Sequence, residues 1–477
     1  FVESGLPYGT SWSVTYNGVT KSSTSSLITF NATSTPQSFS VPRINTSTCN
    51  YAPSPSAGSV AGGSIQIVSF TCSTVISTGS STTVTFVESG LPYGTSWSVT
   101  YNGVTKSSTS SLITFNATST PQSFSVPQVT NPFVYNPSPS SGSVAGGSIQ
   151  IVSFTLPVIN ITNTQNVATP YPFQQMINVS SSSPIWPYIN TNQTSAFGQN
   201  VEFIYPGGLV IPSWLESYST THAIWWVKIL SIPANSSIII YAKIAPKSTN
   251  LFNSKTTGEA PQLSPTYAEY DDGANVFTFY DNFAGKSLNT SKWVANGANY
   301  SVSDGLTYRT NPFETLLLSK TSFTEPYVID WYGYATAGSY GGLYFDAQAD
   351  TANSNANLWE QEGSNPYSSD RLLQIIPGVV TVLYCLWGST INGNYNVYTL
   401  LAGNTTVSIQ VNYNTQLTEY TLQASCSDSL TYSLGYSAYT SGYFGPAQTT
   451  GGDVEFWQWV RVRAYPPNGV MPKVSIG

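Results

Sequence analysis

Charged side chains are scarce in this sequence of 477 residues. Lysine and arginine number 15 and aspartate and glutamate 22, so 8% of the chain is charged and the net charge is −7. Without a basic patch, nucleic acid is a poor partner. With so few carboxylates to protonate, we expect the fold to survive strong acid. His222 is the single histidine, and no acid or nucleophile is placed by sequence to form a triad with it, so we expect a packed or strand-edge residue.

Helical periodicity and long apolar runs are also missing. No stretch repeats apolar residues at i, i+3, i+4 and i+7 over three turns, whereas aromatic residues reach 14% of the chain. This composition predicts an all-β protein of three or four domains. Apolar runs such as 223–227 are far shorter than the roughly 20 residues of a membrane span, so none is expected. The chain starts at Phe1 without a leader pattern, and we expect any secretory signal to have been removed or to lie outside it.

A tandem repeat occupies the first third of the chain. Residues 1–42 recur without a substitution as residues 86–127, which defines a module of about 85 residues. Within it, Trp12, Val14 and Tyr16 alternate with polar residues and lead into an Asn-Gly pair, which predicts a β-hairpin with a two-residue turn. An enzyme needs one site, whereas duplicated modules extend a protein or present one surface twice. The repeat therefore indicates an architectural or binding role.

The four cysteines predict two disulfides. When the repeats are aligned, Cys49 stands opposite Phe133 and Cys72 opposite Leu156, so both cysteines of one repeat are apolar in the other. We infer that the two positions touch, through a disulfide in the first repeat and through apolar contact in the second. The cysteines show no CxxC spacing, which argues against zinc or thioredoxin chemistry. The alternative to two disulfides is four buried free thiols. The second predicted pair joins Cys385 and Cys426.

Asn-x-Ser/Thr acceptors are dense for a surface with so few charges. A chain rich in Ser, Thr and Asn produces some of them by chance, but attached glycan would supply the solubility that charge does not. We expect Asn31 and its duplicate Asn116 to be occupied alike because their surroundings are identical. The acceptors are Asn31, Asn45, Asn116, Asn160, Asn178, Asn192, Asn235, Asn289, Asn299 and Asn404.

Three segments of the repeat form a specific pattern. They are the Glu-Ser-Gly-Leu-Pro-x-Gly-Thr-Ser-Trp-Ser-Val phrase at 3–14, the Asn-Gly turn at 17–18 and the Pro-Ser-Pro-Ser-x-Gly-Ser-Val phrase at 53–60. The pattern resembles a β-rich repeat of large archaeal surface and secreted proteins, including regions appended to thermopsin-like proteases. The resemblance covers residues 1 to about 157. It implies the cell exterior of a thermoacidophile and carries no catalytic residue.

The pattern changes at about residue 171. Residues 171–260 hold four or more strand-like segments, and their order resembles an uncharacterised β-sandwich domain that precedes concanavalin-like jelly rolls in archaeal and bacterial surface proteins. The segments 271–283, 285–293 and 456–463 resemble the joint, the opening and the closing strand of laminin-G and concanavalin-like domains. The predicted units are Ig-like β-sandwich repeats at 1–75 and 86–157, a β-sandwich domain at 165–272, a jelly roll at 276–466 and a C-terminal segment at 467–477.

Acidic residues offer two candidate chemical sites. Glu360 and Glu362 have the i, i+2 spacing that places catalytic carboxylates of concanavalin-like glycoside hydrolases on one strand face. The sequence departs from the Glu-x-Asp-x-x-Glu pattern of those enzymes, so we expect solvated acids and no enzyme. Asp271, Asp272 and Asp281 could hold calcium through turn oxygens, but capping turns use the same residues. No cofactor or metal is therefore expected, with calcium as the alternative.

The closing strand carries the candidate glycan site. Alternation along 454–463 places Trp457, Trp459, Arg461 and Arg463 together on the face opposite the core. Exposed aromatic rings beside guanidinium groups suit stacking on sugars and hydrogen bonding to their hydroxyls. The alternative is that this face packs on a neighbouring domain or subunit.

The sequence leaves three functions open. The first is an extracellular structural or adhesive protein of a cell surface that self-associates, as in a filament. In that case the segment 472–477 would complete the first repeat of the next chain, because the first repeat lacks the strand residues that 82–87 supply in the second. Completion of both ends by further residues of a longer polypeptide is the alternative. The second function is a glycan-binding lectin module, and the third is a glycoside hydrolase.

Overall fold

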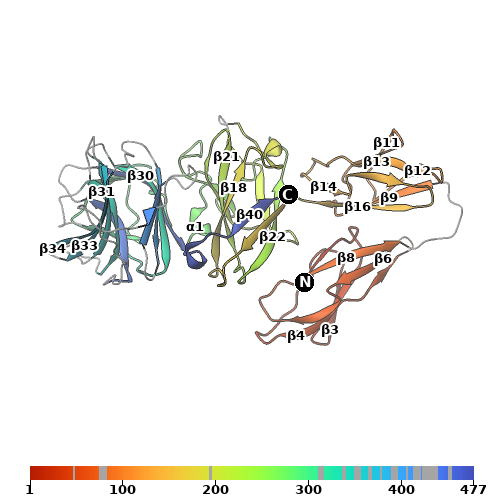
Figure 1. Cartoon of the computed structure of the whole chain (residues 1–477), viewed down its shortest axis with the longest axis horizontal. Helices are drawn as coiled ribbons and strands as arrows, with labels where there is room; N and C mark the ends of the chain where they lie inside the picture. The colour runs from red at the N-terminus through yellow and green to blue at the C-terminus, as the bar shows by residue number, and fades with distance from the viewer. Residues whose placement is uncertain are drawn as a thin grey trace.

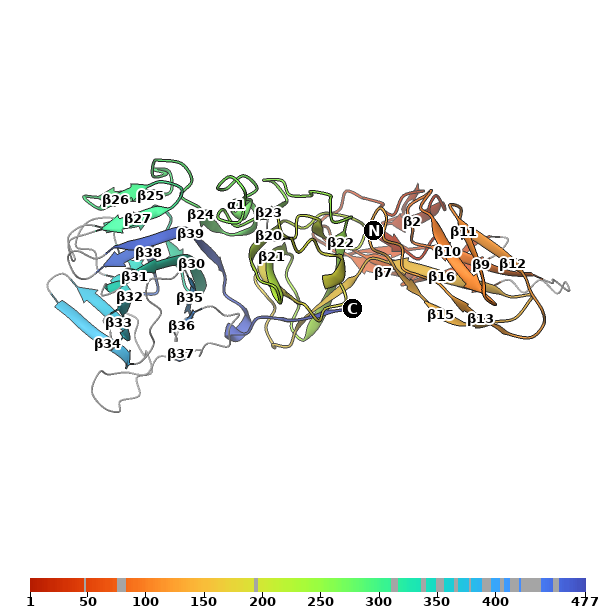
Figure 2. The same ribbon diagram turned by 90° about the horizontal axis from the view of Figure 1, so that it is seen from above.

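The computed structural model confirms the predicted all-β fold. Its units follow one another in a row, with the two repeats at one end and the jelly roll at the other (Figure 1 and Figure 2). No helix among the described residues is long and apolar enough to cross a membrane. The structure describes residues 1–477 except 47–48, 75–82, 193–195, 310–315, 336–339, 349–355, 364–367, 377–378, 388–395, 404–406, 412–419, 422–438 and 449–453.

The first repeat is a sandwich of two four-stranded sheets, ordered β1-β8-β6-β5 and β3-β2-β4-β7. Trp12, Val14 and Tyr16 are buried, as the alternation predicts. The predicted turn is formed by Asn17 and Gly18, whose φ angles of 48° and 76° fit a two-residue hairpin loop. The strands are β1 (Val2–Ser4), β2 (Trp12–Tyr16), β3 (Val19–Ser23), β4 (Gln37–Ser40), β5 (Ile44–Asn45), β6 (Cys49–Ser54), β7 (Ala57–Val60) and β8 (Ile67–Thr74).

The second repeat has the same two-sheet plan, ordered β12-β9-β16-β14 and β11-β10-β13-β15. Its strand β12 pairs along its whole length with residues 83–87 of β9, whereas the identical residues of the first repeat make one bridge, between Leu27 and Val2. The same residues therefore form a strand opposite β9 and a single bridge opposite β1. The strands are β9 (Thr83–Ser89), β10 (Trp97–Tyr101), β11 (Val104–Ser108), β12 (Leu112–Asn116), β13 (Gln122–Ser125), β14 (Asn136–Ser138), β15 (Ser141–Val144) and β16 (Ile149–Thr155).

The disulfide of the first repeat is confirmed. Cys49 and Cys72 are bonded with their Cα atoms 5.4 Å apart. In the second repeat, Phe133 and Leu156 both pack against the core, and Phe133 also lies 4.6 Å below the ammonium of Lys243 in the next domain. The position that is cross-linked in one copy therefore serves as a domain contact in the other. Both Cys426 and the side chain of Cys385 lie outside the described residues.

The β-sandwich domain consists of sheets β19-β22-β17-β40 and β18-β21-β20-β23. The prediction that the C-terminal segment is donated to another chain is wrong, because β40 pairs antiparallel with β17 of its own chain. Strand β17 precedes the predicted start of this domain at 165. The elements are β17 (Val158–Asn163), β18 (Phe173–Ser180), η1 (Trp186–Tyr188), β19 (Val201–Ile204), β20 (Ser213–Tyr218), β21 (His222–Ile229), β22 (Ser236–Ile244), β23 (Thr257–Glu259), α1 (Gly273–Val276), η2 (Pro467–Gly469) and β40 (Lys473–Ile476).

The jelly roll faces an eight-stranded sheet with a six-stranded one, and its core contains Trp293, Trp331 and Trp457. A two-stranded sheet, β25-β28, lies beside them. The strands are β24 (Phe279–Asp281), β25 (Trp293–Asn296), β26 (Asn299–Val302), β27 (Leu306–Arg309), β28 (Leu316–Ser319), β29 (Phe323–Thr324), β30 (Tyr327–Ala335), β31 (Tyr340–Ala347), β32 (Ala356–Gly363), β33 (Ser368–Ile376), β34 (Val379–Trp387), β35 (Asn396–Ala402), β36 (Val407–Val411), β37 (Tyr420–Thr421), β38 (Ser441–Gln448) and β39 (Glu455–Ala464).

Reduction of the Cys49–Cys72 bond should destabilise the first repeat alone. The two cysteines are separated by 23 positions in the sequence, and the chain-entropy model gives about 3 kcal/mol for a loop of this size. Hydrogen exchange read on peptides from 49–74 should speed up after reduction, while peptides from 133–155 should be unchanged. Equal protection of 49–74 before and after reduction would contradict this expectation.

Candidate binding site

The four residues predicted to form an exposed glycan site are buried. Trp457, Trp459, Arg461 and Arg463 are 1%, 0%, 0% and 5% exposed, so the prediction of an exposed face is wrong. They also do not share one face. The pairing of β39 with β30 shifts register at Gln458, and this bulge turns Trp457 into the jelly-roll core while Trp459 packs against the sandwich domain. The alternative, a face packed on a neighbouring domain, describes the structure.

Arg461 is the centre of this domain contact. Its Nη2 lies 2.5 Å from Oε2 of Glu216 on β20, and its Nε lies 2.7 Å from Oδ2 of Asp330 on β30. The guanidinium is also 4.4 Å from the ring centroid of Trp226 and 4.5 Å from that of Phe277. A charge buried in this way is tolerated because it is paired and surrounded by aromatic faces.

Asp330 is shared between two arginines. Nε of Arg463 also lies 2.7 Å from its Oδ2, and the hydroxyl of Thr399 donates to Oδ1 at 2.7 Å. Burial alone would raise the pKa of Asp330, but Arg463 and Arg461 outweigh that effect and hold the pKa at about 2. The carboxylate therefore stays charged over almost the whole pH range.

Replacing Arg461 should loosen the two domains from each other. R461M leaves Glu216 and Asp330 buried with one cation fewer, and removal of one partner from a buried ion pair typically costs roughly 3–5 kcal/mol. The exposed Arg309 on β27 provides the matched control. The free energy of unfolding measured in urea should fall clearly for R461M and change little for R309M. A loss for R461M no larger than that for R309M would refute the assigned role.

Most carboxyl groups with a perturbed pKa are shifted upward by burial. Burial raises the pKa of Glu455 to about 8, although Trp457 Nε1 donates to it at 2.8 Å and opposes the shift. Glu325 reaches about 8 through burial and the nearby Asp346. The other carboxyls whose pKa burial raises are Glu3 and Glu259, both to about 7, and Glu88, Asp271 and Asp272.

The protein should consequently be more stable in acid than at neutral pH. A carboxyl whose pKa is raised by folding contributes stability that is complete below its unfolded pKa of about 4 and is lost as the pH rises through 7 to 8. Asp330 has a lowered pKa and therefore acts oppositely, since its contribution to stability is lost only as the pH falls toward 2. The melting temperature should therefore be higher at pH 4 than at pH 8, and E455Q should reduce the difference. A melting temperature that rises from pH 4 to pH 8 would refute this.

Asp271 and Asp281, two of the three remaining acidic candidates, accept hydrogen bonds from aromatic side chains, and Asp272 is buried. Asp271 accepts hydrogen bonds from Trp214 Nε1 at 2.9 Å and from the Tyr280 hydroxyl at 2.6 Å, whereas Asp281 accepts one from Trp293 Nε1 at 2.5 Å. Within the described part of the chain, no group of three or more His, Cys, Asp or Glu residues could hold a metal ion. These contacts assign both aspartates to structural hydrogen bonds.

The other predicted residues lie apart from one another. His222 begins β21, and its Nδ1 lies 2.9 Å from Ser219 Oγ, as expected for a packed strand-end residue. Glu360 and Glu362 lie on β32, which ends at Gly363, and their side chains are outside the described residues. Asn404 is also outside, Asn160 is half-buried, and the other Asn-x-Ser/Thr acceptors are exposed. Their occupancy stays a prediction.

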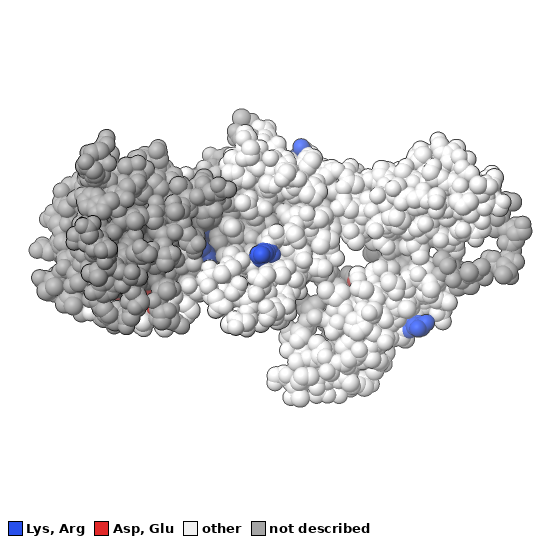
Figure 3. Space-filling view, in the orientation of Figure 1, with Lys and Arg blue, Asp and Glu red and all other residues white. Residues whose placement is uncertain are grey.

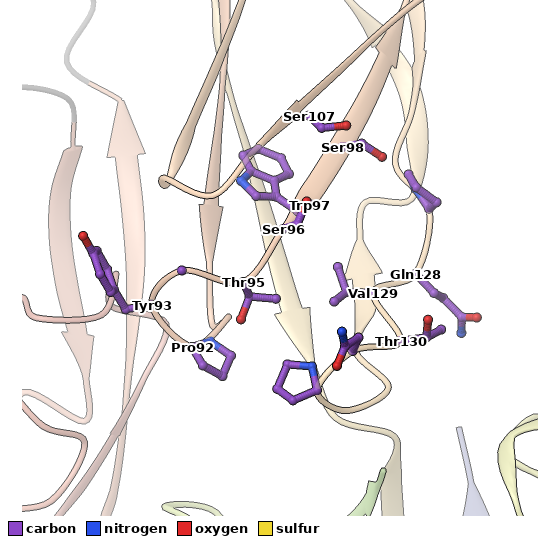
Figure 4. A pocket seen from close by; sticks show the side chains of 14 residues that line it. Pro92, Tyr93, Thr95, Ser96, Trp97, Ser98, Ser107, Gln128, Val129 and Thr130 are labelled. Atoms are coloured by element: carbon purple, nitrogen blue, oxygen red, sulfur yellow. The ribbon is translucent and has the colours of Figure 1, made fainter. Parts of the chain in front are cut away.

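An open groove lies on the second repeat. It has a volume of about 570 Å³, and none of its lining side chains is charged. Figure 4 shows Tyr93 on one side, Gln128 and Thr130 on the other, and Thr95 and Ser96 between them. The lining residues are Pro92, Tyr93, Gly94, Thr95, Ser96, Trp97, Ser98, Ser107, Pro127, Gln128, Val129, Thr130, Asn131 and Pro132.

Both walls of the groove are held in place. Tyr93 and Gly94 are the central residues of a tight turn closed by Thr95 N donating to Pro92 O at 3.0 Å. Gly94 has a φ of +80°, which fits a type II turn, and this turn leaves Tyr93 84% exposed. On the other wall, Gln128 Nε2 donates to Asn136 at 2.5 Å, and its Oε1 accepts the hydroxyl of Tyr188 from the next domain. Sequence reasoning missed this site, although the Pro-Tyr-Gly-Thr turn signal was visible.

Comparison with known proteins identifies a family model and a relative that match this chain. Residues 197–296 match the model of a domain of unknown function, DUF2341. An uncharacterised protein, protein 562 of Sulfolobus islandicus rod-shaped virus 1, is 28% identical over 375 residues, which are 72% of this chain. The chain spans 63% of the length of that relative. The resemblance of residues 1–157 to thermopsin-associated repeats stays a prediction.

Several solved structures align with part of this chain. Carbohydrate binding module CBM66 from Bacillus subtilis aligns over 36% of this chain and 92% of its own, with 13% identity and a TM-score of 0.25. A putative beta-glucanase from Mycobacterium abscessus aligns over 39% and 99%, with 14% identity and a TM-score of 0.29. A beta-1,3-glucanase from Mycobacterium marinum aligns over 39% and 98%, with 13% identity and a TM-score of 0.28. TM-scores at this level do not define a shared function.

Proposed function

We propose that this chain is an extracellular glycan-binding protein and that the groove beside Tyr93 takes a neutral saccharide. The observation that carries the proposal is a ring that is 84% exposed at the edge of a groove without charged side chains. An aromatic face suits the apolar C–H face of a sugar ring. The hydroxyls and amides of Ser96, Gln128 and Asn131 supply donors and acceptors for sugar hydroxyls.

Preorganisation supports the same proposal. The tight turn fixes the backbone below Tyr93, and Gln128 is held from two sides. A site that is already ordered loses little conformational entropy when it binds a ligand. Weak contacts to a neutral ligand can then contribute to net affinity.

The surroundings fit an exterior location. The disulfide between Cys49 and Cys72 is of the kind that persists in oxidising compartments. The face seen in Figure 3 shows isolated patches of lysine and arginine and very little acidic surface on the described residues. A surface of this kind favours neutral ligands over highly charged ones.

An adhesive role is compatible with this binding function. The groove lies where the second repeat meets the sandwich domain, because its Gln128 accepts the hydroxyl of Tyr188, and the jelly roll lies at the far end of the row (Figure 1). Filament assembly by strand donation needs a free C-terminal strand, but β40 is paired with β17 of its own chain. A glycoside hydrolase is the other candidate, and sugar release that disappears in E360Q would favour it.

Removal of the Tyr93 ring should weaken glycan binding. The probes are neutral gluco-, manno- and galacto-oligosaccharides, with an acidic oligosaccharide for comparison, titrated calorimetrically against the full chain. Y93A should lose roughly tenfold in affinity for a neutral oligosaccharide, equivalent to about 1.4 kcal/mol. The control is Y171A, because Tyr171 is 75% exposed and lies outside the groove. Binding that is unchanged in Y93A, or confined to the acidic probe, would refute the proposed function.

A further inference from the structure

The duplicated tyrosines meet at the junction of the two repeats. Tyr8 occupies in the first repeat the position that Tyr93 occupies in the second, on an identical turn with Gly9 at a φ of +81°. Their ring centroids are 6.3 Å apart with an interplanar angle of 30°. Tyr8 is nevertheless 70% exposed and Tyr93 84% exposed. The pair therefore keeps most of its aromatic surface open to solvent, which a purely structural contact would bury.

The contact between the repeats is visible as a difference between identical residues. Ser89 is 3% exposed, and its Oγ donates to Gly5 O of the first repeat at 3.3 Å. Its duplicate, Ser4, is exposed. The first repeat thus covers the base of the second repeat's turn and places Tyr8 beside Tyr93, next to the groove's own lining.

We propose that Tyr8 and Tyr93 form one stacking platform, so that a single extended site runs from the groove of the second repeat onto the first. The inference rests on the proposed function and specifies its ligand as a linear neutral oligosaccharide. Two adjacent rings can each contact a different sugar of one chain. A ligand restricted to a terminal sugar would contact Tyr93 and leave Tyr8 unused.

The walls of the two repeats explain why there is one composite site. Both repeats share the Pro-Tyr-Gly-Thr turn, but the opposite wall diverges after Pro127 and its duplicate Pro42. Gln128, which is held by Tyr188, is replaced by Arg43 in the first repeat. The first repeat therefore contributes a ring to the platform without the uncharged wall that completes the groove.

Chain-length dependence tests the proposal. Disaccharides and hexasaccharides of the neutral gluco-, manno- and galacto- series are titrated against the parent chain, Y8A, Y8F, Y8L and Y93A. Y8A and Y8L should bind the hexasaccharide roughly tenfold more weakly and the disaccharide as the parent does. Y8F should bind both like the parent, because stacking needs the ring and not the hydroxyl. Y93A should weaken both.

The outcomes separate this inference from the proposed function. Weakening by Y93A without any effect of Y8A on the hexasaccharide would overturn the shared platform and leave the groove as the site. Restoration of hexasaccharide binding by Y8L would also overturn it, because an apolar contact between the repeats would then be sufficient. No effect of Y93A on any ligand would overturn the proposed function itself. The exposure of Tyr8 makes misfolding of these variants unexpected, and circular dichroism checks it.

Discussion

The buried guanidinium of Arg461 fixes how the two large domains meet. It comes from the closing strand of the jelly roll, but one of its carboxylate partners, Glu216, belongs to the sandwich domain. Arg461 and Glu216 are both fully buried, so separating the domains would expose these two charges and the aromatic rings around them to water. Such an arrangement favours one relative orientation over sliding alternatives, because a displaced pair would leave charges desolvated and unpaired. Trp214 and Trp459, whose ring centroids are 5.1 Å apart, complete the seal.

Irregularities in two strands make this contact possible. Strand β20 shifts register at Glu216 against β21, and strand β39 shifts at Gln458 against β30. Each bulge redirects the residues that follow it. Regular alternation would have placed Trp457 beside Trp459, and the jelly roll would then have lost a tryptophan from its core. The bulge at Gln458 thus places Trp457 in the jelly-roll core and Trp459 in the contact with the sandwich domain.

Local signals predicted the local structure well. The Asn-Gly turn, the alternation of Trp12, Val14 and Tyr16, and the Cys49–Cys72 pair all appear in the structure, because short-range sterics and internal duplication determine them. Bulges have no comparable signal in one sequence, so the face of Trp457 could not be read from spacing. The groove was missed for a different reason. Its walls come from the 92–98 and 127–132 segments and depend on Tyr188 of another domain, a contact that spacing along the chain does not reveal.

The partnership of β17 and β40 makes the jelly roll an insertion within the sandwich domain. Ile159 pairs opposite Ile476, so β17 and β40 are neighbours in one sheet. In the sequence, almost the whole of the sandwich domain and all of the jelly roll lie between these two strands. During synthesis, the edge of β17 has no partner on that side until β40 has left the ribosome. Contacts of such long sequence separation form late and slowly. The order of assembly is thereby constrained, because the jelly roll is fully synthesised before β40 can complete the sheet that contains β17.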